Sequence, residues 1–318
     1  MPRLLRKLIV PCTLVIISFH AIADKFSQEQ QADIAIKQLY RTLHSKPQSN
    51  LPSRIDAIST TFLEKPYLKG ALGEGAKSDY DNLPLYRIDA FDCETFVDTV
   101  LALTLADNLK NFKQYINKVR YKKGHVSFIN RNHFTCLDWN QNNQQQGFIK
   151  DITSTIKDKK GRSVSKTAAT LIDKPSFYRH LTPSIIRVQP LNTKDKDRRL
   201  IALKQQGKHL PRQLSRIPYI PLTALFDENG KANRELFNQI PDGSIIEIVR
   251  PNWDLHKQIG THLNVSHLGF AIRHQDTLIF RAATSTNKKI VDCPLIDYLR
   301  ETRKSPTIKG INIQIISK

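Results

Sequence analysis

The chain has 318 residues, of which 40% are hydrophobic and 25% are charged, with 49 Lys and Arg against 29 Asp and Glu. These proportions are typical of a folded globular protein and exclude a disordered or fibrous chain. The net charge of +20 favours anionic partners such as cell-wall polymers or lipid head groups. Nucleic acid is not expected, because no binding motif is present and the basic residues are not interleaved with aromatic ones.

The N-terminus has the pattern of a secretory signal. Three basic residues precede an apolar run over residues 8–19, and Ala21-Ile22-Ala23 fits the small-x-small rule for cleavage. A membrane anchor is the alternative, but this run is shorter than the roughly 20 apolar residues that span a bilayer. We expect residues 1–23 to be removed, leaving one periplasmic or secreted domain over residues 24–318 without stable membrane insertion.

The first half of the mature chain is predicted to be mainly helical. Apolar spacing predicts helices over residues 33–44 and 112–119, and a helix that begins at Cys93. Three glycines indicate a loop over residues 66–75, and the Gln/Asn-rich residues 140–147 are interpreted as a polar loop. Residues 154–216 are rich in Lys, Arg, Thr and Pro, and they are interpreted as a basic insertion or a lid.

The second half is predicted to form an antiparallel sheet. Short segments rich in β-branched residues occur at 244–249, 265–272, 277–281, 289–291 and 310–316. Helices followed by such strands indicate an α+β architecture.

Cys93 is the first candidate catalytic residue. Asp92 is a good N-cap, and the apolar residues that follow predict a helix whose first turn contains Cys93. The amides and dipole of a helix start favour a thiolate, so we expect a lowered thiol pKa. The alternative is that Cys93 is a small, inert core residue.

His267 is the candidate base, because cysteine catalysis needs a group that accepts the thiol proton and later protonates the leaving amine. Alternation on the predicted strand sends Leu268, Phe270 and Ile272 to a core face and His267 to the other face, where small neighbours leave room for substrate or for the cysteine helix. A purely structural histidine is the alternative.

The other chemical motifs are weaker. Cys136 and Cys293 could pair and leave Cys93 as the free thiol, although spacing does not establish that connectivity. His125, His133 and Cys136 have a spacing compatible with zinc but lack a second ligand pair, so neither a metal nor a cofactor is expected. No Gly-x-Ser-x-Gly elbow, phosphate loop or dinucleotide fingerprint is present.

Several motifs in order carry a family resemblance. They are Phe62-Leu63-x-x-Pro66-Tyr67, Phe91-Asp92-Cys93-x-Thr95-Phe96-Val97, Asp138-Trp139, Ile217-Pro218-Tyr219-Ile220-Pro221, Asp242-Gly243-Ser244-Ile245-Ile246 and His267-x-Gly269-Phe270-Ala271. Together they resemble a bacterial N-acetylmuramoyl-L-alanine amidase family in the NlpC-type branch of papain-like cysteine hydrolases. The resemblance covers residues 61–315 and implies a cysteine-bearing helix packed on an antiparallel sheet that carries the histidine.

The resemblance implies an enzyme that cleaves the amide between N-acetylmuramic acid and L-alanine in peptidoglycan or its fragments. Separately, we expect the protein to be a monomer. Cys93 would be the nucleophile and His267 the base, and we expect Tyr67, Asp92, Ser266 and Arg281 to contact substrate. The family usually places a polar residue, often histidine, at a third position that here falls on Arg281 or Ala282. Neither can accept the imidazole hydrogen. A stem-peptide endopeptidase or a non-catalytic wall-binding protein therefore stay as alternatives.

Overall fold

The computed structural model describes residues 27–188 and 192–317, so the predicted signal at 1–23 lies outside the described residues. The helices of the first half have these bounds: α2 (Gln28–Ser45), α3 (Leu51–Thr60), α4 (Cys93–Leu105), α5 (Leu109–Arg120), α6 (Asn140–Gln145), α7 (Lys174–His180) and α8 (Thr193–Lys208). The later ones are α9 (Leu222–Leu225), α10 (Arg234–Asn238), α11 (His256–Ile259) and α12 (Leu295–Thr302). In the described part, no helix is long and apolar enough to span a bilayer.

An eight-stranded antiparallel sheet forms the centre of the fold. Its strands are β1 (Ile149–Asp151), β2 (Lys166–Asp173), β3 (Arg212–Pro221), β4 (Ser244–Leu255), β5 (Thr261–His274), β6 (Thr277–Thr284), β7 (Lys289–Pro294) and β8 (Gly310–Ile316). Their order is β2-β3-β8-β4-β5-β6-β7, and β1 pairs with β8. The predicted α+β class, the antiparallel sheet and all five predicted strands are confirmed.

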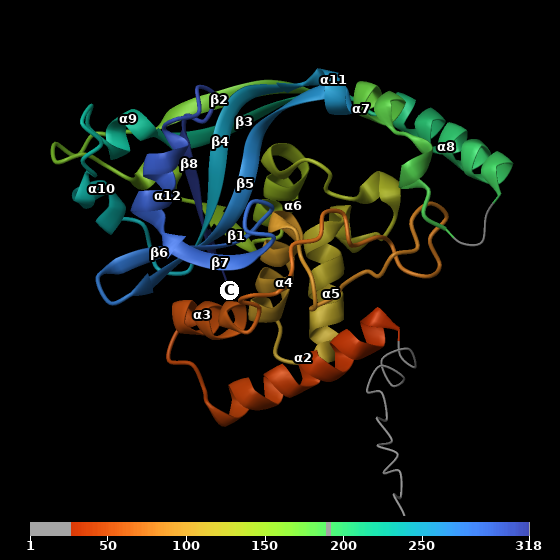
Figure 1. Ribbon diagram of the computed structural model, residues 1–318, viewed down its shortest axis with the longest axis horizontal. Coiled ribbons are helices and arrows are strands. Elements are labelled where there is room, and N and C mark those ends of the chain that lie inside the picture. Colours follow the sequence, from red (N-terminus) through yellow and green to blue (C-terminus); the bar gives the residue numbers. More distant parts are fainter. Residues whose placement is uncertain (1–26, 189–191, 318) are drawn as a thin grey trace, which may run out of the picture.

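Helices cover both faces of the sheet (Figure 1). On one face, α2 to α5 enclose a core that includes Phe96, Val97, Leu268 and Phe270. On the other face, short helices including α12 enclose a second core that includes Ala271, Phe280 and Leu299. Helix α4 is buried around its whole circumference from Thr95 to Leu105, because its sequence is apolar on every side.

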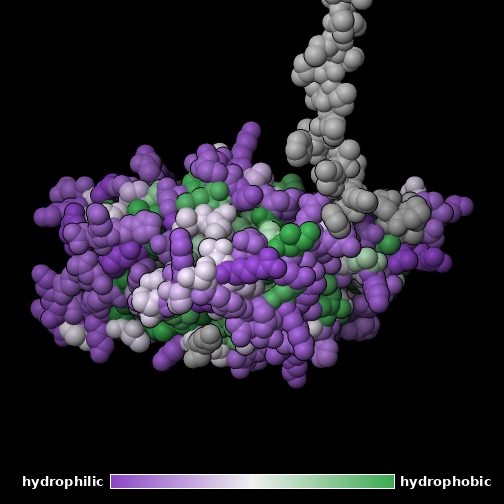
Figure 2. All heavy atoms as spheres, turned by 90° about the horizontal axis from the view of Figure 1, so that it is seen from below, coloured by the Kyte–Doolittle hydropathy of each residue, from purple (hydrophilic) through white to green (hydrophobic). Residues whose placement is uncertain are grey.

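The surface outside these cores is largely polar. Seen from the side of α2 and α3, hydrophilic residues cover most of the molecule and apolar patches are small and scattered (Figure 2). The surface composition is typical of a protein with two enclosed cores, and single exposed apolar residues need no special explanation.

The basic segment at 154–216 contributes strands to the same sheet. Its β2 pairs with β3 from Lys166↔Tyr219 to Asp173↔Arg212, and β3 continues beside β8 at Ile220 and Pro221. Helices α7 and α8 lie between these two strands in the chain, and they pack on a cluster around Phe128 and Tyr178. The segment is therefore joined to the sheet rather than separated from it.

Two sequence predictions are wrong. Most of the predicted polar loop at residues 140–147 forms α6. A π-helical turn at Thr135–Trp139 leads directly into this helix, and the side-chain amide of Asn143 donates a hydrogen bond to the Trp139 carbonyl at 2.9 Å. The proposed Cys136–Cys293 disulfide is absent, and both residues are free thiols, as is Cys93. Cys136 and Cys293 belong to different apolar clusters, so they do not approach each other.

Candidate active site

Cys93 is the first residue of α4. The Asp92 carboxylate accepts a hydrogen bond from the Thr95 amide at 2.9 Å, and the Thr95 hydroxyl accepts one from the Asp92 amide at 2.9 Å. This capping box satisfies amides that a helix start otherwise leaves unpaired. The prediction that Asp92 caps a helix with Cys93 in its first turn is confirmed.

The start of α4 meets β5 where the β5–β6 ladder ends. These strands pair between Phe270↔Arg281 and His274↔Thr277. Two residues before Phe270, the backbone of Leu268 hydrogen-bonds the Cys93 thiol. The rings of Phe96 and Phe270, with centroids 5.8 Å apart, hold the next turn of α4 against the same strand. The thiol therefore lies beside the residue that follows His267 in the chain.

The electrostatic environment of Cys93 opposes ionisation. Burial raises the pKa of the thiol from 9.0 to about 12, and the carboxylates of Asp92 and Glu94 add to the rise. Hydrogen bonds from the backbone of Leu268 and Glu94 lower the pKa but do not outweigh these effects. The predicted depression of the thiol pKa is wrong, because the helix start that supplies amides also brings two carboxylates to the sulfur.

A β-bulge sets the position of His267. Ile248 pairs with His267 and Val249 with Val265, so Ser266 is the extra residue between two ladder pairs. Bulges of this kind redirect neighbouring side chains and recur near active sites. Burial lowers the pKa of His267 to about 4, so its imidazole is neutral at pH 7 and can accept a proton.

The two faces of β5 are only partly as predicted. Leu268, Phe270 and Ile272 lie in the core beneath α4, which confirms the core face. The opposite face does not receive the cysteine helix, because α12 covers it and the His267 ring lies against Phe280 and Tyr298, with centroids 5.7 and 6.2 Å away. Helix α4 instead packs on the Leu268 side of β5.

Tyr298 is a candidate site residue that the sequence reasoning missed. Its ring centroid lies 6.2 Å from that of His267 and 4.7 Å from that of Phe280, and burial raises the pKa of its phenol. The local sequence Leu295-Ile296-Asp297-Tyr298-Leu299 carries no catalytic motif. Its amphipathic pattern predicts a packed helix but does not indicate which site that helix reaches.

Two of the predicted contact residues lie at the start of α4. Tyr67 forms an isolated β-bridge with Phe91, two residues before Cys93, and burial raises the pKa of its phenol. The second carboxylate oxygen of Asp92 accepts the Gly70 amide at 3.1 Å, so both oxygens of Asp92 hold backbone in place. Ser266, at the bulge, donates to the Ile248 carbonyl at 3.3 Å.

Arg281 has a different environment from the one expected. Its side chain is 1% exposed, and its guanidinium binds the carboxylates of Asp292 on β7 at 2.7 Å and Asp56 on α3 at 2.8 Å. The guanidinium nitrogen that binds Asp56 also donates to the Ser59 hydroxyl at 2.8 Å and to the Thr60 hydroxyl at 2.7 Å. A buried guanidinium with these partners is not available to substrate, so we correct its expected role: Arg281 fastens α3 to the sheet.

Ala282, the other residue at the family's third position, lies beside Gly269. A Cβ added at Gly269 would stand 2.7 Å from the Ala282 Cβ and 2.6 Å from the Arg281 carbonyl oxygen. The close approach of β5 and β6 therefore requires glycine here. Ala282 offers no polar atom toward His267, and in the described part of the chain no hydrogen bond to the imidazole is present.

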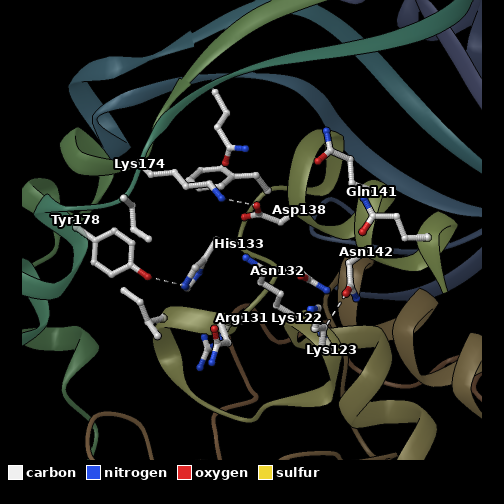
Figure 3. A pocket seen from close by; sticks show the side chains of 16 residues that line it. Lys122, Lys123, Arg131, Asn132, His133, Asp138, Gln141, Asn142, Lys174 and Tyr178 are labelled. Atoms are coloured by element: carbon white, nitrogen blue, oxygen red, sulfur yellow. Dashed lines mark hydrogen bonds and ion pairs between the residues drawn. The ribbon is translucent and has the colours of Figure 1, made fainter.

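An inner cavity adjoins the start of α4, and a basic cavity lies beside it. The inner cavity, of about 170 Å³, is lined by residues that include Gly70, Asp92, Glu94, Thr95 and Trp139. The basic cavity, of about 390 Å³, has the charged lining residues Lys122, Lys123, Arg131, Asp138 and Lys174 (Figure 3). Both are lined by Arg131, Asn132 and His133, so the two cavities share a wall.

The histidine and cysteine residues with zinc-like spacing do not form a metal site. Among the residues that the structure describes, no group of three or more His, Cys, Asp or Glu side chains is arranged to hold a metal ion. His133 instead hydrogen-bonds the Phe128 carbonyl at 2.8 Å, and Cys136 is buried in an apolar cluster.

These observations define an α+β protein. A helix that begins with a cysteine packs against the strand of an antiparallel sheet that carries a histidine. The model of the N-acetylmuramoyl-L-alanine amidase-like family matches residues 57–308. The chain therefore belongs to this amidase-like family.

Solved structures share this fold. A protein from Legionella pneumophila is 50% identical, with 92% of this chain and 96% of that chain covered and a TM-score of 0.89. An N-acetylmuramoyl-L-alanine amidase from Bacteroides uniformis is 23% identical over 85% of this chain and 100% of that chain, with a TM-score of 0.58, which is a likeness of fold. No match was found among curated proteins.

Proposed function

We propose that this protein is an exported cysteine amidase that hydrolyses the bond between N-acetylmuramic acid and L-alanine in peptidoglycan fragments. The observation that carries the proposal is the packing of α4, which begins at Cys93, on the strand that holds His267, with the Phe96 and Phe270 ring centroids 5.8 Å apart. Membership in the amidase-like family supports the substrate class. The predicted signal at residues 1–23 supports action outside the cytoplasm, in a periplasm or after secretion, and the helix-on-sheet arrangement supports the NlpC-type, papain-like fold.

Neutral partners begin the reaction. His267 accepts the Cys93 proton as the sulfur attacks the lactyl carbonyl, and backbone amides at the start of α4 stabilise the oxyanion. Protonated His267 then gives its proton to the leaving L-alanine nitrogen, which breaks the amide bond and leaves a thioester. Water, deprotonated by His267, hydrolyses the thioester and restores the thiol.

Tyr298 takes the positioning role that Arg281 and Ala282 do not provide. Its ring centroid lies 6.2 Å from that of the His267 ring. A phenol can orient an imidazole directly or through one water. Tyr67 contributes a second phenol near the nucleophile, where it contacts substrate.

Mass spectrometry of muropeptides tests the proposal. The mature protein should release free stem peptide and free sugar, and the Cys93→Ala variant should release neither. Cys293→Ala is the matched control, because it removes a second half-buried thiol and should leave turnover intact. Cleavage inside the stem peptide would replace the proposal with an endopeptidase, and binding without any Cys93-dependent product would replace it with a wall-binding protein.

A further inference from the structure

The basic cavity shares a wall with the inner cavity, whose lining includes Asp92 and Glu94 on either side of Cys93, and it takes no part in the chemistry described above. Its lining comes from the turn after α5, from residues 129–134 and from α7 with the start of β3. In Figure 3, Lys174 and Tyr178 point from α7 toward Asp138 and His133. A volume of about 390 Å³ is in the range of small-ligand sites.

The charge of this cavity favours an anion. Lys174 is paired with Asp138 at 2.5 Å, and Arg131 is paired with Asp81 at 3.0 Å and with Glu74. Lys122 and Lys123 are exposed at the mouth, and in the described part of the chain neither has an acidic partner within ion-pair distance. Arg187 also pairs with Asp81, so the two arginines balance Asp81 and Glu74, and Lys122 and Lys123 leave an excess of positive charge.

The backbone holds both lysines at the mouth. Lys123 has a φ of 54°, a left-handed conformation that is uncommon for residues other than glycine. The Asn142 side chain, itself part of the lining, accepts the Lys123 amide at 3.3 Å and supports this turn. Conformations of this kind persist where the surrounding structure holds them, and they concentrate at ligand sites.

The remaining lining suits a peptide. Gln141 and Gln213 present amide groups that can pair with peptide N–H and C=O groups. Burial and the nearby charges of Arg131 and Lys174 lower the pKa of His133 to about 3, so the shared wall carries a neutral imidazole. A ligand that runs from the inner cavity into the basic cavity would pass this wall with its anionic end at Lys122 and Lys123.

We propose that the basic cavity is a subsite for the carboxylate-bearing end of the stem peptide, a proposal that rests on the amidase function above. The peptide leaves the scissile amide through its amino end, so its free carboxylates lie away from Cys93. Lys122 and Lys123 recognise these carboxylates, and the basic segment at 154–216 closes the far wall of the subsite. The enzyme accordingly prefers fragments with a free carboxyl end.

The test compares an N-acetylmuramoyl peptide that ends in a free carboxylate with its C-terminal amide. Lys122→Gln/Lys123→Gln should lower kcat/KM for the acid about tenfold, chiefly through KM, with little effect on the amide. Lys159→Gln/Lys160→Gln is the matched control, since it removes two adjacent exposed lysines outside both cavities. Equal losses for acid and amide, or no loss, would overturn the proposal.

Calorimetry on the Cys93→Ala protein separates this inference from the amidase function. The acid should bind more tightly than the amide, its affinity should fall with added salt, and the Lys122→Gln/Lys123→Gln substitutions should remove the preference. Retention of that preference in the lysine variant would refute the subsite even if turnover is normal. Preferential, lysine-dependent binding without turnover in the unmutated protein would refute the amidase and leave the subsite standing.

Discussion

The thiol of Cys93 should be far less reactive at neutral pH than an ordinary cysteine. Its pKa rises from 9.0 to about 12 because burial and the carboxylates of Asp92 and Glu94 disfavour the thiolate. A rise of about three units lowers the thiolate fraction at pH 7.5 about a thousandfold. The structure therefore predicts slow alkylation at neutral pH and a rate that increases about tenfold for each pH unit.

The assay is the rate of iodoacetamide labelling at Cys93 between pH 6 and pH 10, read by peptide mass spectrometry. The Cys93→Ser variant gives the background from Cys136 and Cys293, and circular dichroism at each pH confirms that the protein stays folded. A labelling rate that stays constant between pH 6 and pH 8 would refute the reasoning. It would mean that a thiolate–imidazolium pair already exists, and that the helix start outweighs burial and the two carboxylates.

The packing around the site leads to three further predictions. Arg281→Met should lower the free energy of unfolding, measured by urea denaturation, by about 3 kcal/mol, because Asp56 and Asp292 lose their shared partner. Unchanged stability together with lost activity would instead indicate that Arg281 contacts substrate. Tyr298→Phe should reduce kcat about tenfold with little change in KM, and it should shift the acid limb of the pH–rate profile, since the phenol positions His267. An unaltered kcat and pH–rate profile would show that Tyr298 has no positioning role. Gly269→Ala should destabilise the fold by about 2 kcal/mol, measured by thermal unfolding, because the new Cβ would lie 2.6 Å from the Arg281 carbonyl oxygen. An unchanged stability of this variant would show that β5 and β6 can move apart without cost.

Local sequence determined the elements that carry the chemistry. A capping residue followed by an apolar run specifies where a helix begins, so the sequence alone places Asp92 at the cap and Cys93 in the first turn. The C-terminal strands were equally predictable, because β-branched residues and alternation are local properties. The Asn/Gln-rich helix α6 was not, since the π-helical turn that starts it and the tertiary contacts of its buried asparagines outweigh its low helix propensity.

Tertiary structure alone decided how these residues interact. The thiol pKa depends on burial and on the sum of several opposing charges, and local sequence showed only the helix start. Arg281 is expected at the site from its sequence position, but the fold pairs it with Asp56 on α3 and Asp292 on β7. The basic cavity is lined by residues from 122–145 and from 174–213. The ring of Tyr298 on α12 lies against that of His267 on β5. Such contacts form between segments that are distant in sequence, so periodicity, capping and propensity carry no information about them.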